Sequence, residues 1–163
     1  MKMIVIIVAV IVLVIAVVYL VGYFMPVKHQ AIYTVKLKSA PPAVWTVITD
    51  RHHFPVWRKG LKKAEVHDQK RWTEISGDGT IDYEEDSAIP NQIMVTRIAN
   101  KNLPFGGSWT FELKPDNGGT QLTITENGEV YNPIFRFMSK YVFGHTATIR
   151  QFANDLSKKL NAN

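Results

Sequence analysis

The chain has 163 residues, which is enough for one ordinary domain and a short additional element. Its formal net charge is +5 and it contains no cysteine, so a disulfide framework and a cysteine nucleophile are excluded. The basic residues form short clusters that acidic residues interrupt, whereas a nucleic-acid-binding groove needs a basic stripe with interleaved aromatic residues. We therefore expect no nucleic-acid partner.

Residues 3–25 form an apolar run without a charged residue. A helix needs about 20 apolar residues to cross the hydrocarbon core of a bilayer, so this run is long enough to span it. Tyr19, Tyr23 and Phe24 lie toward its C-terminal end, where aromatic side chains prefer the headgroup level. A cleaved signal peptide would have a shorter apolar core and a small-residue cleavage site, and a core helix would carry a polar stripe. We predict a single-pass transmembrane anchor over residues 3–25.

The sequence does not decide on which side of the membrane the rest of the chain lies. Lys2 and the amino terminus precede the apolar run, and Lys28, Lys36 and Lys38 follow it. Positive residues favour the cytoplasmic flank, but here the two flanks nearly balance. The absence of cysteine suits a reducing and an oxidising compartment equally well.

The residues after the anchor alternate between apolar and polar, which is typical of half-buried strands. A first strand is predicted near residues 31–38, and a short helix starts at Pro41 and Pro42. From Leu61 onward the pattern predicts a meander of about six antiparallel strands. The residues predicted to face inward from these strands are Tyr33, Val35, Leu37, Ile81, Tyr83, Ile93, Val95, Trp109, Phe111, Leu122 and Ile124.

A helix is predicted after Asn132, which is a suitable N-cap, with Pro133 at the first helical position. Beyond this start, residues of one stripe recur at steps of three and four. They are Ile134, Met138, Tyr141, His145, Ile149, Phe152, Leu156 and Leu160. This pattern predicts one continuous helix of about seven turns. Its apolar stripe must be buried, and the concave face of the sheet is the available surface.

The chain from about residue 30 to its C-terminus resembles the START-like superfamily, also called SRPBCC, of polyketide cyclases, lipid-transfer domains and birch-pollen-allergen-like proteins. The resemblance rests on Ser39-Ala40-Pro41-Pro42-Ala43-Val44-Trp45, on Phe54-Pro55-Val56-Trp57, and on residues 103–109 and 125–133, which are similar to bacterial membrane-anchored members. It implies an α+β helix-grip fold over residues 30–163, in which a curved antiparallel sheet surrounds the C-terminal helix. Members include lipid carriers, hormone receptors, quinone-binding proteins and a few enzymes, so the fold alone does not choose a function.

A sheet that grips one helix leaves a space between the two, and this space is the natural ligand site. The residues predicted to contact an apolar ligand there are Tyr33, Val35, Ile81, Tyr83, Val95, Phe105, Trp109, Phe111, Ile124, Met138 and Tyr141. Phe105 enters this set as the tip of a Gly- and Pro-containing loop that either covers the mouth of the cavity or is an ordinary hairpin loop. The alternative for the other residues is that they fill a solid core.

Three polar residues are also predicted to contact the ligand: Arg97 shares the face of Val95, Glu126 shares the face of Ile124, and His145 lies on the helix stripe. A buried charge needs a partner, so we expect an Arg97–Glu126 pair or a His145–Glu126 hydrogen bond. These groups would hold the polar head of a ligand, perform acid–base chemistry, or only satisfy one another. The remaining histidines have no partner at a metal-ligand spacing, so neither a metal nor another cofactor is predicted.

The favoured hypothesis is a membrane-anchored binding protein, without catalysis, for a small hydrophobic ligand such as a lipid or a quinone-like molecule. The sequence contains no serine-nucleophile elbow and no Gly-rich phosphate loop, so no catalytic residue is predicted. Two alternatives remain open. One is a cyclase or dehydratase that acts on an apolar substrate through His145, Glu126 and Tyr83 or Tyr141. The other is an interaction module whose groove is filled by side chains.

Overall fold

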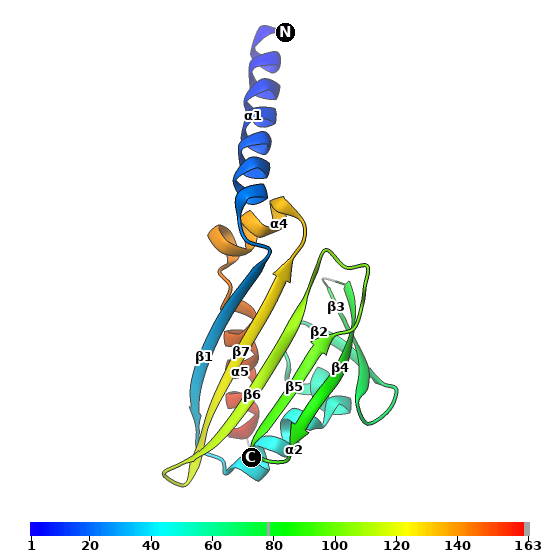
Figure 1. The fold of residues 1–163 in the computed structure, drawn as a ribbon, viewed down its shortest axis with the longest axis vertical. Helices are drawn as coiled ribbons and strands as arrows, with labels where there is room; N and C mark the ends of the chain where they lie inside the picture. Colours follow the sequence, from blue (N-terminus) through cyan, green and yellow to red (C-terminus); the bar gives the residue numbers. More distant parts are fainter. Residues whose placement is uncertain (78, 162–163) are drawn as a thin grey trace.

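The computed structural model describes residues 1–77 and 79–161, and Figure 1 shows a long N-terminal helix that projects from a domain of sheet and helices. This helix, α1 (Lys2–Phe24), forms over the predicted apolar run. Its length and composition suffice for a membrane span, and no part of its most apolar stretch is buried. Within the described chain, α1 therefore differs from the core helix of a soluble domain, whose apolar side chains would be covered by protein.

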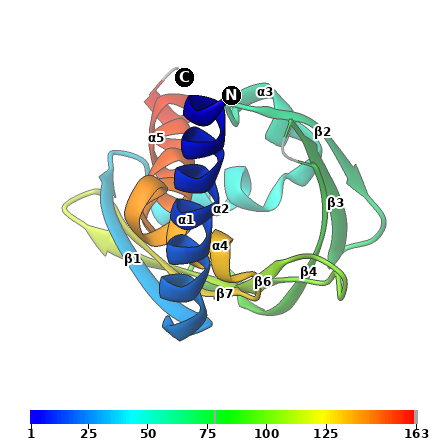
Figure 2. The same ribbon diagram turned by 90° about the horizontal axis from the view of Figure 1, so that it is seen from above.

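The domain is built on one seven-stranded sheet with the strand order β1-β7-β6-β5-β4-β3-β2. All neighbouring strands are antiparallel, so the first strand pairs with the last and the others follow as a meander. The strands are β1 (Lys28–Leu37), β2 (Leu61–Val66), β3 (Arg71–Ser76), β4 (Gly79–Ile89), β5 (Ile93–Ile98), β6 (Phe105–Asp116) and β7 (Gly119–Val130). Seen from above, the sheet curls strongly around the helices that it encloses (Figure 2).

Short helical elements connect β1 to β2, and they are α2 (Pro41–Thr49), η1 (Arg51–His53) and α3 (Phe54–Trp57). Prolines stand in the first turn of both α2 and α3, where the missing N–H removes no helical hydrogen bond. Val44 and Ile48 of α2 are completely or almost completely buried against the sheet and α5 (Ala147–Asn161). These elements therefore close the end of the sheet that is remote from α1, as Figure 1 shows.

The core lies between α5 and the concave face of the sheet. Ile149, Phe152 and Leu156 of α5 are buried, and so are Leu122 and Ile124 of β7. Burying each such side chain stabilises the fold by about 1.5–3 kcal/mol, which is what fixes the helix on the sheet. The predicted α+β helix-grip fold is thus confirmed.

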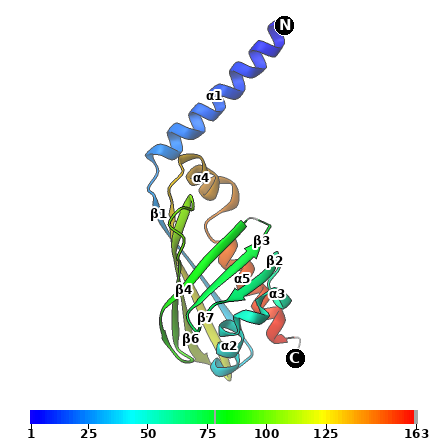
Figure 3. The ribbon, with the colours of Figure 1, turned by 90° about the vertical axis from the view of Figure 1, so that its right-hand side faces the viewer.

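The prediction of one continuous C-terminal helix is wrong. The segment divides into α4 (Pro133–Met138), one π-helical turn η2 (Ser139–Phe143) and α5 (Ala147–Asn161). The division occurs at Gly144, whose φ of 77° lies in the left-handed region that only glycine adopts without strain. Asn132 does cap α4, since its side chain accepts hydrogen bonds from the backbone N–H groups of Ile134 and Phe135. As Figure 3 shows, α4 consequently lies beside the base of α1 while α5 runs along the sheet.

Candidate ligand-binding cavity

A cavity of about 710 Å³ lies between the concave face of the sheet, α5 and the short helices. This volume is within the range of about 300–1,000 Å³ that is typical of small-molecule sites. Its walls are predominantly apolar and aromatic, and they include Phe54, Trp72, Ile81, Tyr83, Ile98, Trp109, Phe111 and Phe152. The alternative of a solid core filled by side chains is therefore not the structure that forms.

The rim of the cavity at the α1 end is built by the loop before β6 and by the segment after β7. Leu103 and Pro104 come from the former, with Phe105 as the first residue of β6, whereas Phe135 and Phe143 come from the latter. The two are joined where the backbone N–H of Tyr131 donates to the carbonyl of Pro104, at 2.9 Å. These residues of the cavity wall therefore lie at the end of the domain from which α1 projects (Figure 1).

The residues predicted to contact the ligand divide into those that border this cavity and those that lie elsewhere. Bordering it are Ile81, Tyr83, Arg97, Phe105, Trp109, Phe111, Glu126 and His145. The remaining predicted residues, none of which borders it, are Tyr33, Val35, Val95, Ile124, Met138 and Tyr141. For Tyr33, Val35 and Ile124 the division reflects where α5 sits, because the helix covers the β1 and β7 side of the sheet and leaves the other side open.

Three of the residues outside the cavity wall are held by core packing, and two others lie where the C-terminal helix divides. Tyr33 and Val35 of β1 pack against the core cluster, and the guanidinium of Arg150 lies 5.8 Å from the ring centre of Tyr33. Ile124 is completely buried in the same core. Met138 and Tyr141 belong to α4 and η2 and are therefore not on the buried stripe of α5, and Tyr141 is 58% exposed.

The predicted inward face of β5 is wrong. In the register with β6, Met94 lies opposite Phe111 and Thr96 opposite Trp109, so Met94, Thr96 and Ile98 face the interior. Ile93 and Val95 consequently lie on the convex face, and Arg97, which has the same parity, borders the cavity at its exposed edge. Both faces of this strand carry apolar residues, so alternation alone cannot choose between them.

The predicted Arg97–Glu126 pair is absent from the structure. The Arg97 guanidinium instead donates from Nε to Asp86 at 2.6 Å and from Nη2 to Glu84 at 2.5 Å. Its side chain is 45% exposed, so these are surface ion pairs at the edge of the cavity. Their acidic partners lie on β4, where a register shift after Glu85 brings Asp86 next to the guanidinium.

A first polar cluster in the cavity consists of His29, Glu126 and His145. The rings of His29 and His145 are stacked with their centres 3.9 Å apart, and His29 Nε2 lies 3.5 Å from Glu126 Oε1. His29 stands over Gly128, its cross-strand neighbour, where an added Cβ would approach the imidazole to 2.3 Å. Glycine at position 128 is therefore what makes room for the imidazole.

Burial moves all three groups of the first cluster toward their neutral forms. It raises the pKa of the Glu126 carboxyl to about 7, and a hydrogen bond from Trp109 opposes only part of this rise. It also lowers the pKa of His29, with His145 adding to the effect, and that of His145, with Lys140 adding to it. Both groups of the His29–Glu126 contact therefore favour the uncharged state, so the contact is not a strong ion pair.

Two atoms of the first cluster have no hydrogen-bond partner within the described part of the chain. They are Glu126 Oε2 and His145 Nδ1, both of which are shielded from solvent. Buried polar atoms are normally paired, so unpaired ones facing a cavity indicate hydrogen-bonding capacity that a ligand or water can use. The sequence contains a signal for His29, because the alternation of Tyr33 and Ala31 continues to it, although His29 is not among the residues predicted to contact the ligand.

A second polar cluster lines the opposite wall and was not predicted. Arg51 Nη2 lies 2.5 Å from Glu85, and the Arg51 guanidinium stacks 4.3 Å from the centre of the Trp72 ring. Arg58 Nη1 and Trp72 Nε1 both donate to Glu74 Oε1, at 2.5 and 3.0 Å. In this cluster Arg51 Nε is the atom without a partner among the described residues. The wall is therefore held by charges that are almost completely paired.

Tyr83 connects this second cluster to the sheet. Its ring stacks on that of Trp72 with the centres 5.3 Å apart. Burial raises the pKa of its phenol above the ordinary value, and the nearby Glu74 carboxylate adds to this shift. The phenol therefore stays neutral at physiological pH. Among the described residues no group of three or more His, Asp or Glu side chains is placed to hold a metal ion.

A family of known proteins matches the part of the chain that forms this domain. The sequence model of the family "Polyketide cyclase / dehydrase and lipid transport" matches residues 29–160. The chain belongs to this family. The match covers the whole sheet except the first residue of β1, together with α2 to α5 except the last residue of α5. The predicted START-like resemblance is thereby confirmed.

Solved structures show the same family fold at low sequence identity. A START superfamily protein from Mycobacterium smegmatis is 15% identical, with a TM-score of 0.67 over 82% of this chain and 98% of that one. A norcoclaurine synthase from Thalictrum, solved with a transition-state analogue, is 11% identical, with a TM-score of 0.67 over 83% and 96%. The di-domain ARO/CYC StfQ of the steffimycin biosynthetic pathway is 10% identical, with a TM-score of 0.67 over 83% and 51%. No curated protein sequence matches the chain.

Proposed function

We propose that this family member is a membrane-anchored binding protein that holds a small hydrophobic ligand, such as a lipid or a quinone-like molecule. The observation that carries the proposal is the cavity of about 710 Å³ with mostly apolar and aromatic walls. The domain that contains it follows directly on α1, which is long and apolar enough to cross a membrane. A domain tethered to a bilayer meets membrane-dissolved molecules at a high effective concentration, so even a modest affinity suffices.

The walls supply the affinity and the first polar cluster supplies selectivity for the ligand's head. Burial of apolar ligand surface contributes about 25 cal/mol per Å², and the aromatic side chains around Trp109 and Phe152 offer this surface. Glu126, His29 and His145 are shifted to neutral forms, so they favour a hydroxyl or carbonyl head over a carboxylate. A ligand carboxylate would add a second acidic group beside Glu126 in a poorly solvated place.

The test is to purify the full chain from membranes in detergent, extract bound small molecules and identify them by mass spectrometry. A cavity-filling variant, Ile81→Trp, places a larger side chain on the wall, and Ile89→Trp is its matched control at the remote end of β4. We expect an apolar molecule to accompany the wild type and Ile89→Trp and to be depleted in Ile81→Trp. Equal recovery from all three proteins, or none from any together with no binding of an apolar dye, would contradict the proposal.

One observation favours a second candidate, an acid–base enzyme acting on an apolar substrate. Glu126 has a pKa raised to about 7 and faces the cavity, so it can both give and take a proton near neutral pH. The isosteric Glu126→Gln variant cannot. If the enzyme hypothesis holds, the molecule extracted from the variant differs chemically from that of the wild type, for example by one retained water. If the same molecule is extracted from the wild type and from Glu126→Gln, the enzyme hypothesis is contradicted and the binding function is the one supported.

A further inference from the structure

The segment between β7 and α5 exposes an unusual amount of apolar surface. We name residues 133–143, which comprise α4 and η2, the roof segment. Its exposed apolar side chains are Ile134, Phe135, Tyr141, Val142 and Phe143, with exposed fractions of 38, 51, 58, 57 and 66%. Single exposed apolar residues are ordinary, but a contiguous group within so short a segment marks an interaction surface.

The roof segment is fixed to the end of α1. Gly22 of α1 lies so close to Pro133 that a Cβ there would come within 1.9 Å of the Pro133 carbonyl oxygen. Arg136 is buried and donates to the carbonyls of Met25 at 2.8 Å and Tyr23 at 3.4 Å. These carbonyls stand at the C-terminal end of α1, where the helix leaves acceptors unpaired and favours a positive charge.

The same segment also borders the cavity. Phe135, Ser139 and Phe143 line its mouth, and the chain then turns at Gly144 into His145 of the first polar cluster. The roof segment therefore has one side toward the ligand site and another toward whatever surrounds the base of α1. Figure 3 shows α4 in this position, between α1 and the open end of the sheet.

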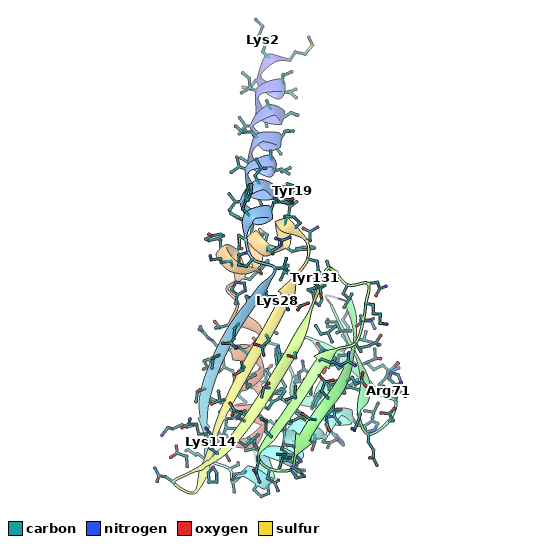
Figure 4. All side chains as sticks on the ribbon, viewed as in Figure 1. Lys2, Tyr19, Lys28, Arg71, Lys114 and Tyr131 are labelled. Carbon is teal, nitrogen blue, oxygen red and sulfur yellow. The ribbon has the colours of Figure 1, made fainter. Side chains whose placement is uncertain are left out.

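We propose that the roof segment lies in the headgroup–acyl boundary of the membrane that α1 crosses, so that the cavity mouth opens toward lipid. The inference rests on the proposed anchoring of α1. Tyr19 of α1 lies just above this level, and Tyr131 and Lys28 lie just below it (Figure 4). Aromatic rings prefer the interface, and lysines near it attract anionic headgroups. The apolar surface thus continues from α1 onto the roof segment and ends below it, at the level of Tyr131 and Lys28.

The test uses the full chain in nanodiscs of mixed zwitterionic and anionic phospholipid. Because the chain has no cysteine, Val142→Cys can be labelled alone with an environment-sensitive fluorophore, and quenching by brominated lipid can be measured. Ile11→Cys, in the middle of α1, reports the span, and Ile89→Cys, 53% exposed at the remote end of β4, reports water. We expect quenching at positions 11 and 142 and none at 89.

The possible results separate this proposal from the anchoring on which it rests. Quenching at position 11 without quenching at position 142 would contradict the proposed position of the roof segment in the membrane interface, while α1 would remain a membrane span. No quenching at 11 would overturn both. A second measurement follows the transfer of an apolar dye from vesicles to the protein, because Val142 does not itself line the cavity.

For this transfer, Val142→Asp is compared with Ile89→Asp, which makes the same change on a side chain of similar exposure. An acidic group in place of a membrane-buried valine is expected to slow transfer about tenfold, with unchanged dye affinity in detergent. Equal transfer rates in the two variants would overturn the proposed opening of the cavity toward lipid.

Discussion

The two polar clusters on opposite walls of the cavity differ in how completely their hydrogen-bonding capacity is used. Arg51 and Arg58 each pair with a carboxylate at 2.5 Å, so that wall keeps its charges. Glu126 and His145 instead favour their neutral forms, and each keeps an atom without a partner among the described residues. The paired wall therefore serves stability, whereas the neutral one retains the capacity to bind a polar group.

Removal of Arg51 is the strongest test of the paired wall. Arg51→Met leaves the half-buried Glu85 carboxylate without its guanidinium and removes the cation above Trp72. Breaking a buried pair on one side costs about 3–5 kcal/mol of unfolding free energy, and we expect a loss of this size. It is measured by denaturant unfolding of the full chain in detergent. A loss below about 1 kcal/mol would show that this wall is not held by its charges.

The neutral wall is tested by Glu126→Gln as a function of pH. In the folded chain the pKa of Glu126 is about 7, against an ordinary value of 4.5, so the folded state holds the proton more firmly between these limits. Stability due to this group is therefore complete below about pH 4.5 and falls as pH rises toward 7. Glutamine does not ionise, so the variant does not lose stability in this way as pH rises. We expect its free energy of unfolding to exceed that of the wild type by up to about 3 kcal/mol near pH 8 and to equal it near pH 4.

The histidines of the neutral wall shift stability with pH in the opposite sense. The pKa values of His29 and His145 are lowered, so the unfolded chain binds protons more readily below about 6.5 and stability rises with pH up to that point. Because both histidines remain in Glu126→Gln, the difference between the two unfolding curves isolates the carboxyl. A difference that does not change between pH 4 and 8 would contradict the raised pKa of Glu126.

A smaller effect is expected from His145→Phe, which keeps the stacking on His29 and removes the ring nitrogens. One lost hydrogen bond is worth about 0.5–1.5 kcal/mol, so the affinity for an apolar probe with a hydroxyl head should fall up to about tenfold. The affinity for a hydrocarbon probe of the same size should not change. Fluorescence displacement measures both, and an equal loss for the two probes would mean that His145 only shapes the cavity.

Arg97→Met gives the smallest effect and is the matched control for Arg51→Met. Arg97 also has two carboxylate contacts at 2.5 and 2.6 Å, but its side chain is 45% exposed where that of Arg51 is 8% exposed. Water and salt screen exposed pairs, so we expect a loss below about 1 kcal/mol that shrinks further in high salt. A loss as large as that of Arg51→Met would show that burial is not what separates the two arginines.

Elements with a local pattern follow from the sequence alone. The uncharged run of α1, the alternation of Trp109, Phe111 and Leu113 in β6, and the Asn132 cap each follow from neighbouring residues. Periodicity also placed Tyr83, Trp109, Glu126 and His145 on the faces that border the cavity, whereas the family fold was implied by the resemblance. Such features are local because periodicity and capping depend on positions only a few residues apart.

Features that depend on distant partners become visible only in the folded chain. The stripe from Ile134 to Leu160 is compatible with one continuous helix, yet the helix breaks at Gly144. The break lets α4 pack on Gly22 and lets Arg136 cap the C-terminal end of α1. The inward face of β5 is chosen by its register with β6, since both of its faces are apolar. His29 joins Glu126 because β1 pairs with β7, about a hundred positions away. These choices arise from packing and pairing between segments remote in sequence, which no local pattern encodes.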